Sequence, residues 1–151
     1  MKKIALAAVI MAVLSMPALF AQNNVFIANP TGNAVSTYKN ALYNYFNDVL
    51  GGFSEFHLVN SQAADSLSQV ITIDRNSRKV SSHYTTSVTS LTGVDYICYT
   101  IIDERNGRLN VEAMLINCST GNLDRMLSRS IARDMNEIRT LAQIFAKQLL
   151  Y

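Results

Sequence analysis

The chain has 151 residues and a formal net charge of +2, from 13 lysines and arginines against 11 aspartates and glutamates. Lys2 and Lys3 supply both excess charges, so residues 22–151 carry 11 basic against 11 acidic side chains and are formally neutral. This balance removes the electrostatic reason to expect nucleic acid or an anionic membrane as a partner, and roughly 130 residues suffice for one domain with a core.

Residues 1–21 have the pattern of a secretory signal peptide. Two lysines precede an uncharged apolar run over residues 4–14, Pro17 follows it, and small residues stand near the cleavage site. A membrane-spanning helix needs about 20 apolar residues, roughly twice this run, so a cleaved signal is favoured over an anchor. Cleavage after Ala21 and cleavage after Ala18 both fit the pattern.

A lipoprotein signal requires a cysteine at the cleavage site. The only cysteines are Cys98 and Cys118, far from either cleavage position. We therefore expect a periplasmic or secreted chain without a lipid anchor.

Strand and helix patterns alternate at the start of the expected mature chain. Residues 24–29 predict a strand, and residues 30–33 have turn chemistry. A helix is then expected with Ser36 as its N-cap and Gly51-Gly52 at its end. Its apolar residues at helical spacing are Tyr38, Leu42, Tyr45, Phe46 and Val49.

Residues 56–59 predict a short second strand, followed by a second helix capped by Asp65 or Ser66. The inward-facing residues of this helix are expected to be Leu67, Val70 and Ile71. Residues 74–93 contain many serines and threonines and fit a poor helix, an exposed strand or a mobile loop. We expect a short helix ending near Gly93.

A β-hairpin is the strongest local prediction. Residues 95–103 are rich in β-branched and aromatic residues. Over residues 109–115, buried apolar positions are expected to alternate with an outward set that includes Met114. Asn106-Gly107 between the two strands is a typical hairpin turn.

The hairpin loop decides whether Cys98 and Cys118 can form a disulfide. A two-residue turn pairs Cys98 with Leu115 and places Cys118 on the other face of the sheet. A three-residue loop offsets the cysteines by about four residues on one face, too far to bond. Only a longer loop sets them opposite each other, so two separate buried thiols are favoured over a bridge.

The C-terminal part predicts one more element and a clear helix. Residues 123–132 fit a last strand with Leu127 and Ile131 inward, or an extension towards the helix. Asp134 as N-cap and Glu137 three residues later make a capping-box pattern. The apolar stripe of the helix consists of Ile138, Leu141, Ala142, Phe145 and Leu149.

The order β-α-β-α, hairpin, helix predicts an α/β (α+β mixed) fold. Residues 22–151 are expected to form one globular domain with a single mixed sheet and helices packed on it.

Candidates for catalysis and metal binding are few. His57 and His83 are the only histidines, and no Gly-x-Ser-x-Gly motif accompanies the many serines. There is no Cys-x-x-Cys, no pair of histidines at helical spacing and no Asp-rich calcium loop. We therefore expect no catalytic residue, no metal site and no cofactor.

Arg125, Arg129 and Arg133 form the one notable charge pattern. Their spacing places them in one stripe on a helix, and also on one face of a strand. They fit either a solvated face or a patch that meets an acidic partner or a cell-wall component. Further candidates for a binding surface are Tyr84, Tyr96 and Tyr99. Strand alternation should bury at least one of the last two.

Three groups of segments together carry a resemblance. Residues 25–27 are followed by a Gly-containing turn and a helix, residues 53–59 lead into 65–67, and residues 92–97 and 115–121 flank the hairpin. These groups resemble, in this order, the opening, the second strand and helix, and the Gly-Ala-Asp-Tyr strand with its closing Thr-Gly turn of one bacterial envelope family. The family comprises the periplasmic domain of the curli secretion channel and the penicillin-binding-protein activator lipoproteins.

The resemblance covers most of the expected mature chain and implies a non-enzymatic periplasmic domain that binds other envelope proteins. A homo-oligomer is a further expectation for the partner. The family's anchoring cysteine, the channel's membrane-crossing segments and the activators' flexible N-terminal arm have no counterpart in the pattern. No functional residue carries over. Two alternatives from other classes are a small secreted hydrolase of wall or lipid, using His57 or His83, and a carrier with an enclosed apolar cavity.

Overall fold

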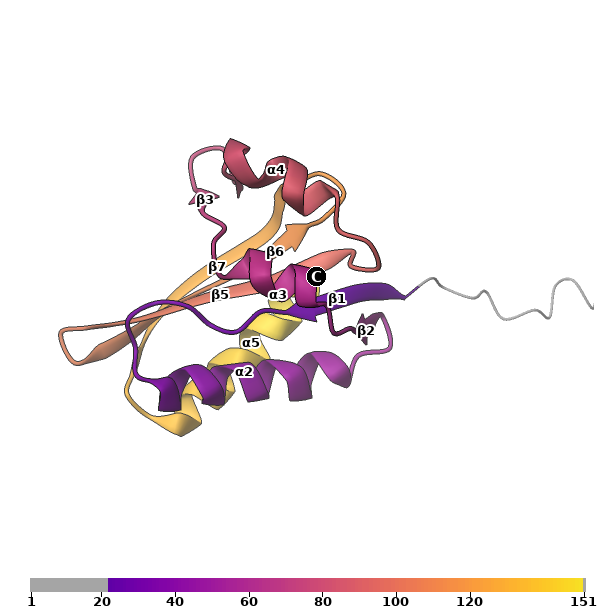
Figure 1. Ribbon diagram of the computed structural model, residues 1–151. Coiled ribbons are helices and arrows are strands. Elements are labelled where there is room, and N and C mark those ends of the chain that lie inside the picture. The colour runs from indigo at the N-terminus through magenta and orange to yellow at the C-terminus, as the bar shows by residue number, and fades with distance from the viewer. Residues whose placement is uncertain (1–21, 151) are drawn as a thin grey trace, which may run out of the picture.

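A computed structural model describes residues 22–150 (Figure 1). The predicted signal peptide at residues 1–21 lies outside the described residues and stays a prediction. The strands are β1 (Asn23–Ile27), β2 (Phe56–Leu58), β3 (Ile73–Asp74), β4 (Lys79–Val80), β5 (Tyr96–Arg105), β6 (Arg108–Asn117) and β7 (Leu123–Ala132). The helices are α2 (Ser36–Gly51), α3 (Gln62–Ser68), α4 (Ser82–Thr89) and α5 (Met135–Leu150).

The main sheet has five strands in the order β2-β1-β5-β6-β7. Strand β1 pairs in parallel with β2 and β5, whereas β5, β6 and β7 are antiparallel, so the predicted mixed sheet is confirmed. One core lies between the sheet and helices α2 and α5 (Figure 1). A second core lies on the opposite face, under α3, α4 and the small β3–β4 hairpin.

Strand β6 is buried more completely than the sequence predicts. Leu109, Val111, Ala113 and Leu115 face the α2–α5 core as expected. Met114 was expected on the outward face, but it is fully buried in the second core. The expectation was wrong because elements far away in the sequence cover the second face of this half of the strand.

Two details of helix α2 differ from the prediction. Its N-cap is Val35, which makes no side-chain cap, so Ser36 is the first helical residue rather than the cap. At the other end Gly52 has a φ of −82°, so the helix ends without a left-handed glycine. The helix buries Leu42, Phe46 and Leu50.

Helix α3 begins earlier than predicted. Ser61, not Asp65 or Ser66, is the cap, and its Oγ accepts a hydrogen bond from the Ala64 amide at 3.1 Å. The shift brings Ala64 and Ser68 into the buried set. Val70 falls just beyond the helix and is 54% exposed, contrary to expectation.

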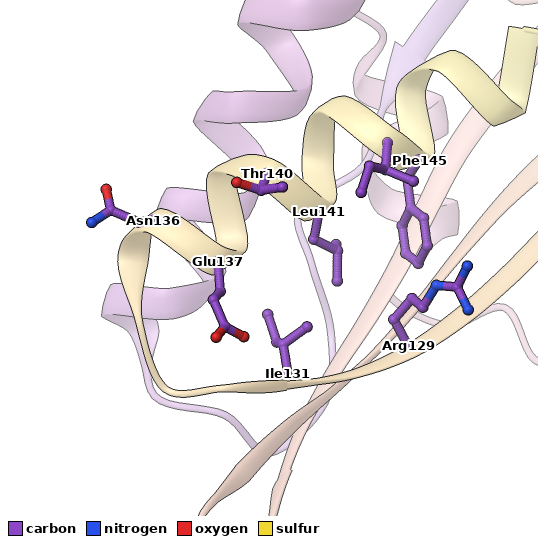
Figure 2. A pocket seen from close by; sticks show the side chains of 8 residues that line it. Arg129, Ile131, Asn136, Glu137, Thr140, Leu141 and Phe145 are labelled. Carbon is purple, nitrogen blue, oxygen red and sulfur yellow. The ribbon is translucent and has the colours of Figure 1, made fainter.

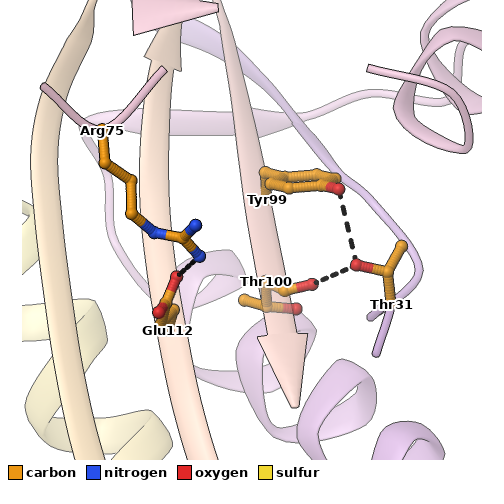
Figure 3. A network of polar contacts seen from close by, with 5 residues as sticks. All are labelled: Thr31, Arg75, Tyr99, Thr100 and Glu112. Carbon is orange, nitrogen blue, oxygen red and sulfur yellow. Dashed lines mark hydrogen bonds and ion pairs between the residues drawn. The ribbon is translucent and has the colours of Figure 1, made fainter. Parts of the chain in front are cut away.

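The Ser/Thr-rich stretch combines two of the predicted alternatives. Strands β3 and β4 form a short antiparallel hairpin, and α4 follows and ends at Thr89, close to the predicted end near Gly93. Arg75 in the turn of the hairpin forms an ion pair with Glu112 of β6 at 2.5 Å (Figure 3). This contact ties the small hairpin to the face of the main sheet.

The β5–β6 hairpin has the two-residue turn. Asn106 and Gly107 both have positive φ, at 52° and 72°. Cys98 is therefore opposite Leu115, and Cys118 lies in the other core. Both cysteines are free and buried, which confirms the prediction of two separate thiols.

Residues 123–132 form the last strand, β7, at the sheet edge. Its Leu127 and Ile131 pack against the α2–α5 core, as the strand alternative predicts. Helix α5 starts after Asp134, whose Oδ1 accepts a hydrogen bond from the Asn136 amide at 2.8 Å. The stripe from Ile138 to Phe145 is buried as predicted, and the side chain of Leu149 lies outside the description.

Thr100 is a buried polar residue in the middle of β5. Thr31 Oγ1 donates to the Tyr99 hydroxyl and to the Thr100 carbonyl oxygen, each at 3.4 Å (Figure 3). The hydroxyl of Thr100 itself has no partner and is the one such buried side-chain atom found among residues 22–150.

We expect Thr100→Val to stabilise the protein by about 1 kcal/mol, because it removes the cost of burying an unpaired hydroxyl without changing the side-chain shape. Urea unfolding measures the change. The matched control is Thr100→Ser, which keeps the hydroxyl and removes the methyl group, and should destabilise. A loss of stability in the valine variant would contradict the prediction.

Candidate protein-binding surface

Arg125 and Arg129 lie on the same face of edge strand β7. Leu127 and Ile131 of this strand pack on the α2–α5 core. The side chains of the odd-numbered residues after Asp124, which include both arginines, therefore lie on the face of β7 that is turned towards α5. Both arginines are exposed. The expected clustering on one strand face therefore holds for these two residues.

Arg133 is placed differently. It follows the last residue of β7, and its Nη1 lies 2.6 Å from Oε1 of Glu104 near the end of β5. Its charge is thus partly neutralised in an exposed ion pair. The structure brings Arg125 and Arg129 together and turns Arg133 towards a different strand.

An open groove runs between β7 and α5, with a volume of about 320 Å³ (Figure 2). We call it the β7–α5 groove; it is lined by Arg129, Ile131, Asn136, Glu137, Thr140, Leu141, Ile144 and Phe145. Most of the surface that these residues present is apolar, and Ile144 on its rim is 42% exposed. Arg129 is the cationic residue of the lining (Figure 2).

Glu137 is one of the residues that line this groove. The capping-box pattern predicts that its carboxylate bonds to the amide of Asp134, but Oε2 accepts instead from the Ala132 amide at 2.9 Å. Glu137 thereby links the start of α5 to the end of β7. Glu137 therefore caps a backbone amide at the start of α5, as the pattern predicts, but the turn between β7 and α5 presents the amide of Ala132 in place of that of Asp134.

A second, polar cavity of about 410 Å³ lies where β1 and β5 begin. Asp95 on its wall accepts a hydrogen bond from the Asn24 amide at 2.7 Å. Partial burial and the nearby Asp124 carboxylate raise the pKa of Tyr96, another lining residue. Of the tyrosines proposed from the sequence, Tyr99 is buried, whereas Tyr84 and Tyr96 are partly exposed.

The histidines lie away from both cavities. His57 on β2 and His83 on α4 are exposed, and neither lines the β7–α5 groove or the polar cavity. His83 makes an edge contact with the ring of Tyr84. Among residues 22–150, no group of three metal-ligating side chains was found.

The two buried thiols predict a pH dependence of stability. Burial raises the pKa of Cys98 to about 12, and burial with the nearby Asp95 raises that of Cys118 to about 11, from an ordinary 9.0. Above about pH 9 the unfolded thiols ionise while the folded ones stay protonated. Stability should therefore fall with rising pH by roughly 1.4 kcal/mol per unit for each thiol.

The measurement is urea unfolding at several pH values between about 8 and 10. A variant carrying Cys98→Ala and Cys118→Ala provides the control, because lysines and tyrosines titrate equally in both proteins. We expect a shallower decline in the double variant. Equal slopes would show that thiol burial does not contribute.

The fold and the site together define an α/β domain that presents an open apolar groove beside an exposed sheet edge. Within the described part of the chain, no helix is long and apolar enough to cross a membrane. No protein-family model matches the chain, and no curated sequence matches it either.

Solved structures share the fold at low sequence identity. The lipoprotein GNA1162 from Neisseria meningitidis is 12% identical, with a TM-score of 0.52 over 84% of this chain and 96% of that one. The C-terminal domain of LpoB from Escherichia coli is 11% identical, with a TM-score of 0.50 over 83% and 94%. TolB from Acinetobacter baumannii is 13% identical, with a TM-score of 0.53, and the match covers 86% of this chain but 28% of TolB.

These similarities support the sequence-based resemblance at the level of the fold. The link to the curli secretion channel stays a prediction. Sequence reasoning found the arginines but missed the groove beside them. Exposed Ile144 was the available signal, because it falls outside the buried stripe of α5.

Proposed function

We propose that this chain is an exported accessory domain of the bacterial cell envelope, folded from residues 22–151, that binds other proteins through the β7–α5 groove. The observation that carries the proposal is the groove's open apolar lining, with Ile144 42% exposed at its rim and Arg129 on its wall. Apolar surface rimmed by polar groups is typical of protein contact sites. The fold shared with a bacterial lipoprotein supports the envelope location.

The other two function classes have less support. A hydrolase of the proposed type needs a histidine in a cleft, and both histidines are exposed outside the two cavities. A carrier needs an enclosed apolar cavity, whereas the apolar groove is open and the larger cavity is polar.

Site-specific photo-crosslinking in the periplasm tests the proposal. A photoreactive residue at position 144 should form adducts with a defined envelope protein. The matched control is position 70, because Val70 is also an exposed apolar residue, at 54%, next to α3. No adduct at 144, or the same adducts at both positions, would contradict a binding role for the groove.

The arginines are tested in the same experiment. Arg125→Glu with Arg129→Glu should reduce adducts at position 144, because both charges lie on the face of β7 that turns towards α5. Arg133→Glu is made separately, since it also breaks the ion pair with Glu104. Unchanged adducts after all three reversals would remove the arginine patch from the proposed surface.

A further inference from the structure

The outer edge of β7 can be assigned residue by residue. On β5, the carbonyls of Cys98, Thr100 and Ile102 accept hydrogen bonds from amides of the segment that follows β1. The backbone N–H and C=O groups of the even-numbered residues of β5 therefore point towards the β1 side. Through the two antiparallel registers, the backbone N–H and C=O groups of the odd-numbered residues of β7 then point towards β6. Its even-numbered residues from Met126 to Ala132 therefore point their backbone groups outward.

Both ends of this edge are closed. At the C-terminal end, the amide of Ala132 donates to Glu137, its carbonyl accepts from Asp134, and the Ser130 carbonyl accepts from Arg108 Nη2 at 3.1 Å. At the other end, the Leu123 amide donates to the Arg78 carbonyl at 2.9 Å in the β3–β4 hairpin.

Between the closed ends lies a short bare stretch, residues 126–130, which we call the edge window. It offers the amide and carbonyl of Met126, the amide and carbonyl of Ser128, and the amide of Ser130. Within the described residues, no hydrogen bond to these outward groups was found. An extended segment of about five residues matches its length.

The side chains beside the window select the chemistry of such a segment. On the α5 face, Arg125 and Arg129 stand either side of Leu127. Further along, the apolar lining of the β7–α5 groove continues to Leu141 and Ile144. A segment added to β7 would place alternate side chains on this face, where acidic residues meet the arginines and apolar residues meet the groove.

A second copy of this chain fits the window poorly. Pairing two β7 strands about Leu127 puts Arg125 directly opposite Arg129 twice, which is repulsive. Pairing them about Ser128 gathers four arginines on one face and requires the Ser130 carbonyl, which Arg108 already occupies. The charges therefore favour an acidic partner over self-association.

We propose that the edge window binds an extended acidic segment of a partner protein by strand addition. This rests on the proposed function, because it names the binding mode at the same surface. Backbone hydrogen bonds supply the attachment. Every second side chain of the added segment lies on the α5 face, where the two arginines favour acidic side chains and Leu127 with the neighbouring groove favours an apolar side chain between them.

The test uses a synthetic peptide with the sequence Glu-Thr-Val-Thr-Glu, which carries Glu, Val and Glu on one face of an extended strand. The matched peptide, Lys-Thr-Val-Thr-Lys, reverses both charges. NMR titration of the full mature chain should shift the amides of Met126, Ser128 and Ser130. Binding of the Glu peptide should be at least about tenfold tighter than that of the Lys peptide. No shift at these amides, or equal binding of both peptides, would overturn the proposal.

Ser128→Pro removes an outward amide without breaking the ladder to β6, a position where an edge strand tolerates proline. It should weaken binding of the Glu peptide at least about tenfold, whereas Ser128→Ala keeps the backbone and should bind like the wild type. If Ser128→Pro unfolds, a Glu peptide N-methylated on its inward-facing amides replaces it and should fail to bind. Unchanged binding in either case would overturn strand addition.

The two proposals fail separately. Photo-crosslinks at position 144 that persist in Ser128→Pro would overturn strand addition and leave the groove as a protein-binding site. Absence of crosslinks at position 144 would overturn the proposed function, whatever the peptide does. Dimerisation of the free chain that Ser128→Pro abolishes would assign the window to a second copy and overturn the acidic partner.

Discussion

Phe46→Ala should destabilise the protein by about 3–5 kcal/mol. Phe46 on α2 is 1% exposed and belongs to the core that α2 and α5 form against the sheet. Truncation removes the buried ring and leaves a cavity that the surrounding core residues fill only in part. Small domains have about 5–15 kcal/mol of stability in total, so the loss is a large fraction of it.

Thermal unfolding should show a fall in Tm of more than about 10 °C. The matched control is Asn44→Ala on the same helix, where the side chain is exposed and the change should be small. Similar Tm values for the two variants would mean that α2 contributes little to the core.

Gly32→Ala should destabilise by about 3 kcal/mol or more, through backbone geometry rather than lost packing. Gly32 has a φ of +102°, and a Cβ there would overlap the carbonyl oxygen of Ile102 and lie 2.8 Å from Oδ1 of Asp103. The overlap would push apart a turn that is bonded to β5. The Asn33 amide donates to Asp103 at 2.8 Å, and the Ala34 amide donates to the Ile102 carbonyl at 3.1 Å.

The control separates strain from overlap. Gly93 also has a positive φ, +73°, but a Cβ there meets nothing within 4 Å. Gly93→Ala should therefore cost only the left-handed strain, about 1 kcal/mol. Urea unfolding of both variants measures the difference, and equal losses would show that the close approach to β5 is unimportant.

The candidate site was only partly predictable. The arginine spacing was visible in the sequence, and Arg125 and Arg129 share a strand face as predicted. Arg133 was misplaced because β7 ends before it, and its position then depends on Glu104, which is distant in sequence. The β7–α5 groove was not predicted, because it depends on how far α5 stands from the edge strand.

The sequence by itself determined the features that depend on a few neighbouring residues. Asn106-Gly107 specifies the two-residue turn, which sets the hairpin register and thereby separates the two thiols. The apolar stripe of α5 likewise identifies its buried face. In both cases steric preference or periodicity acts within one element.

Only the tertiary structure decided the features that depend on which segments meet. Met114 is buried because α3, α4 and their hairpin cover the second face of β6. Glu137 caps the end of β7 because the chain turns sharply between Ala132 and α5. Among the described residues, the edge window has no hydrogen-bond partner because the groups that close its two ends, from the β3–β4 hairpin, β6 and α5, do not reach its outward backbone groups. No local sequence pattern indicates where those three segments end.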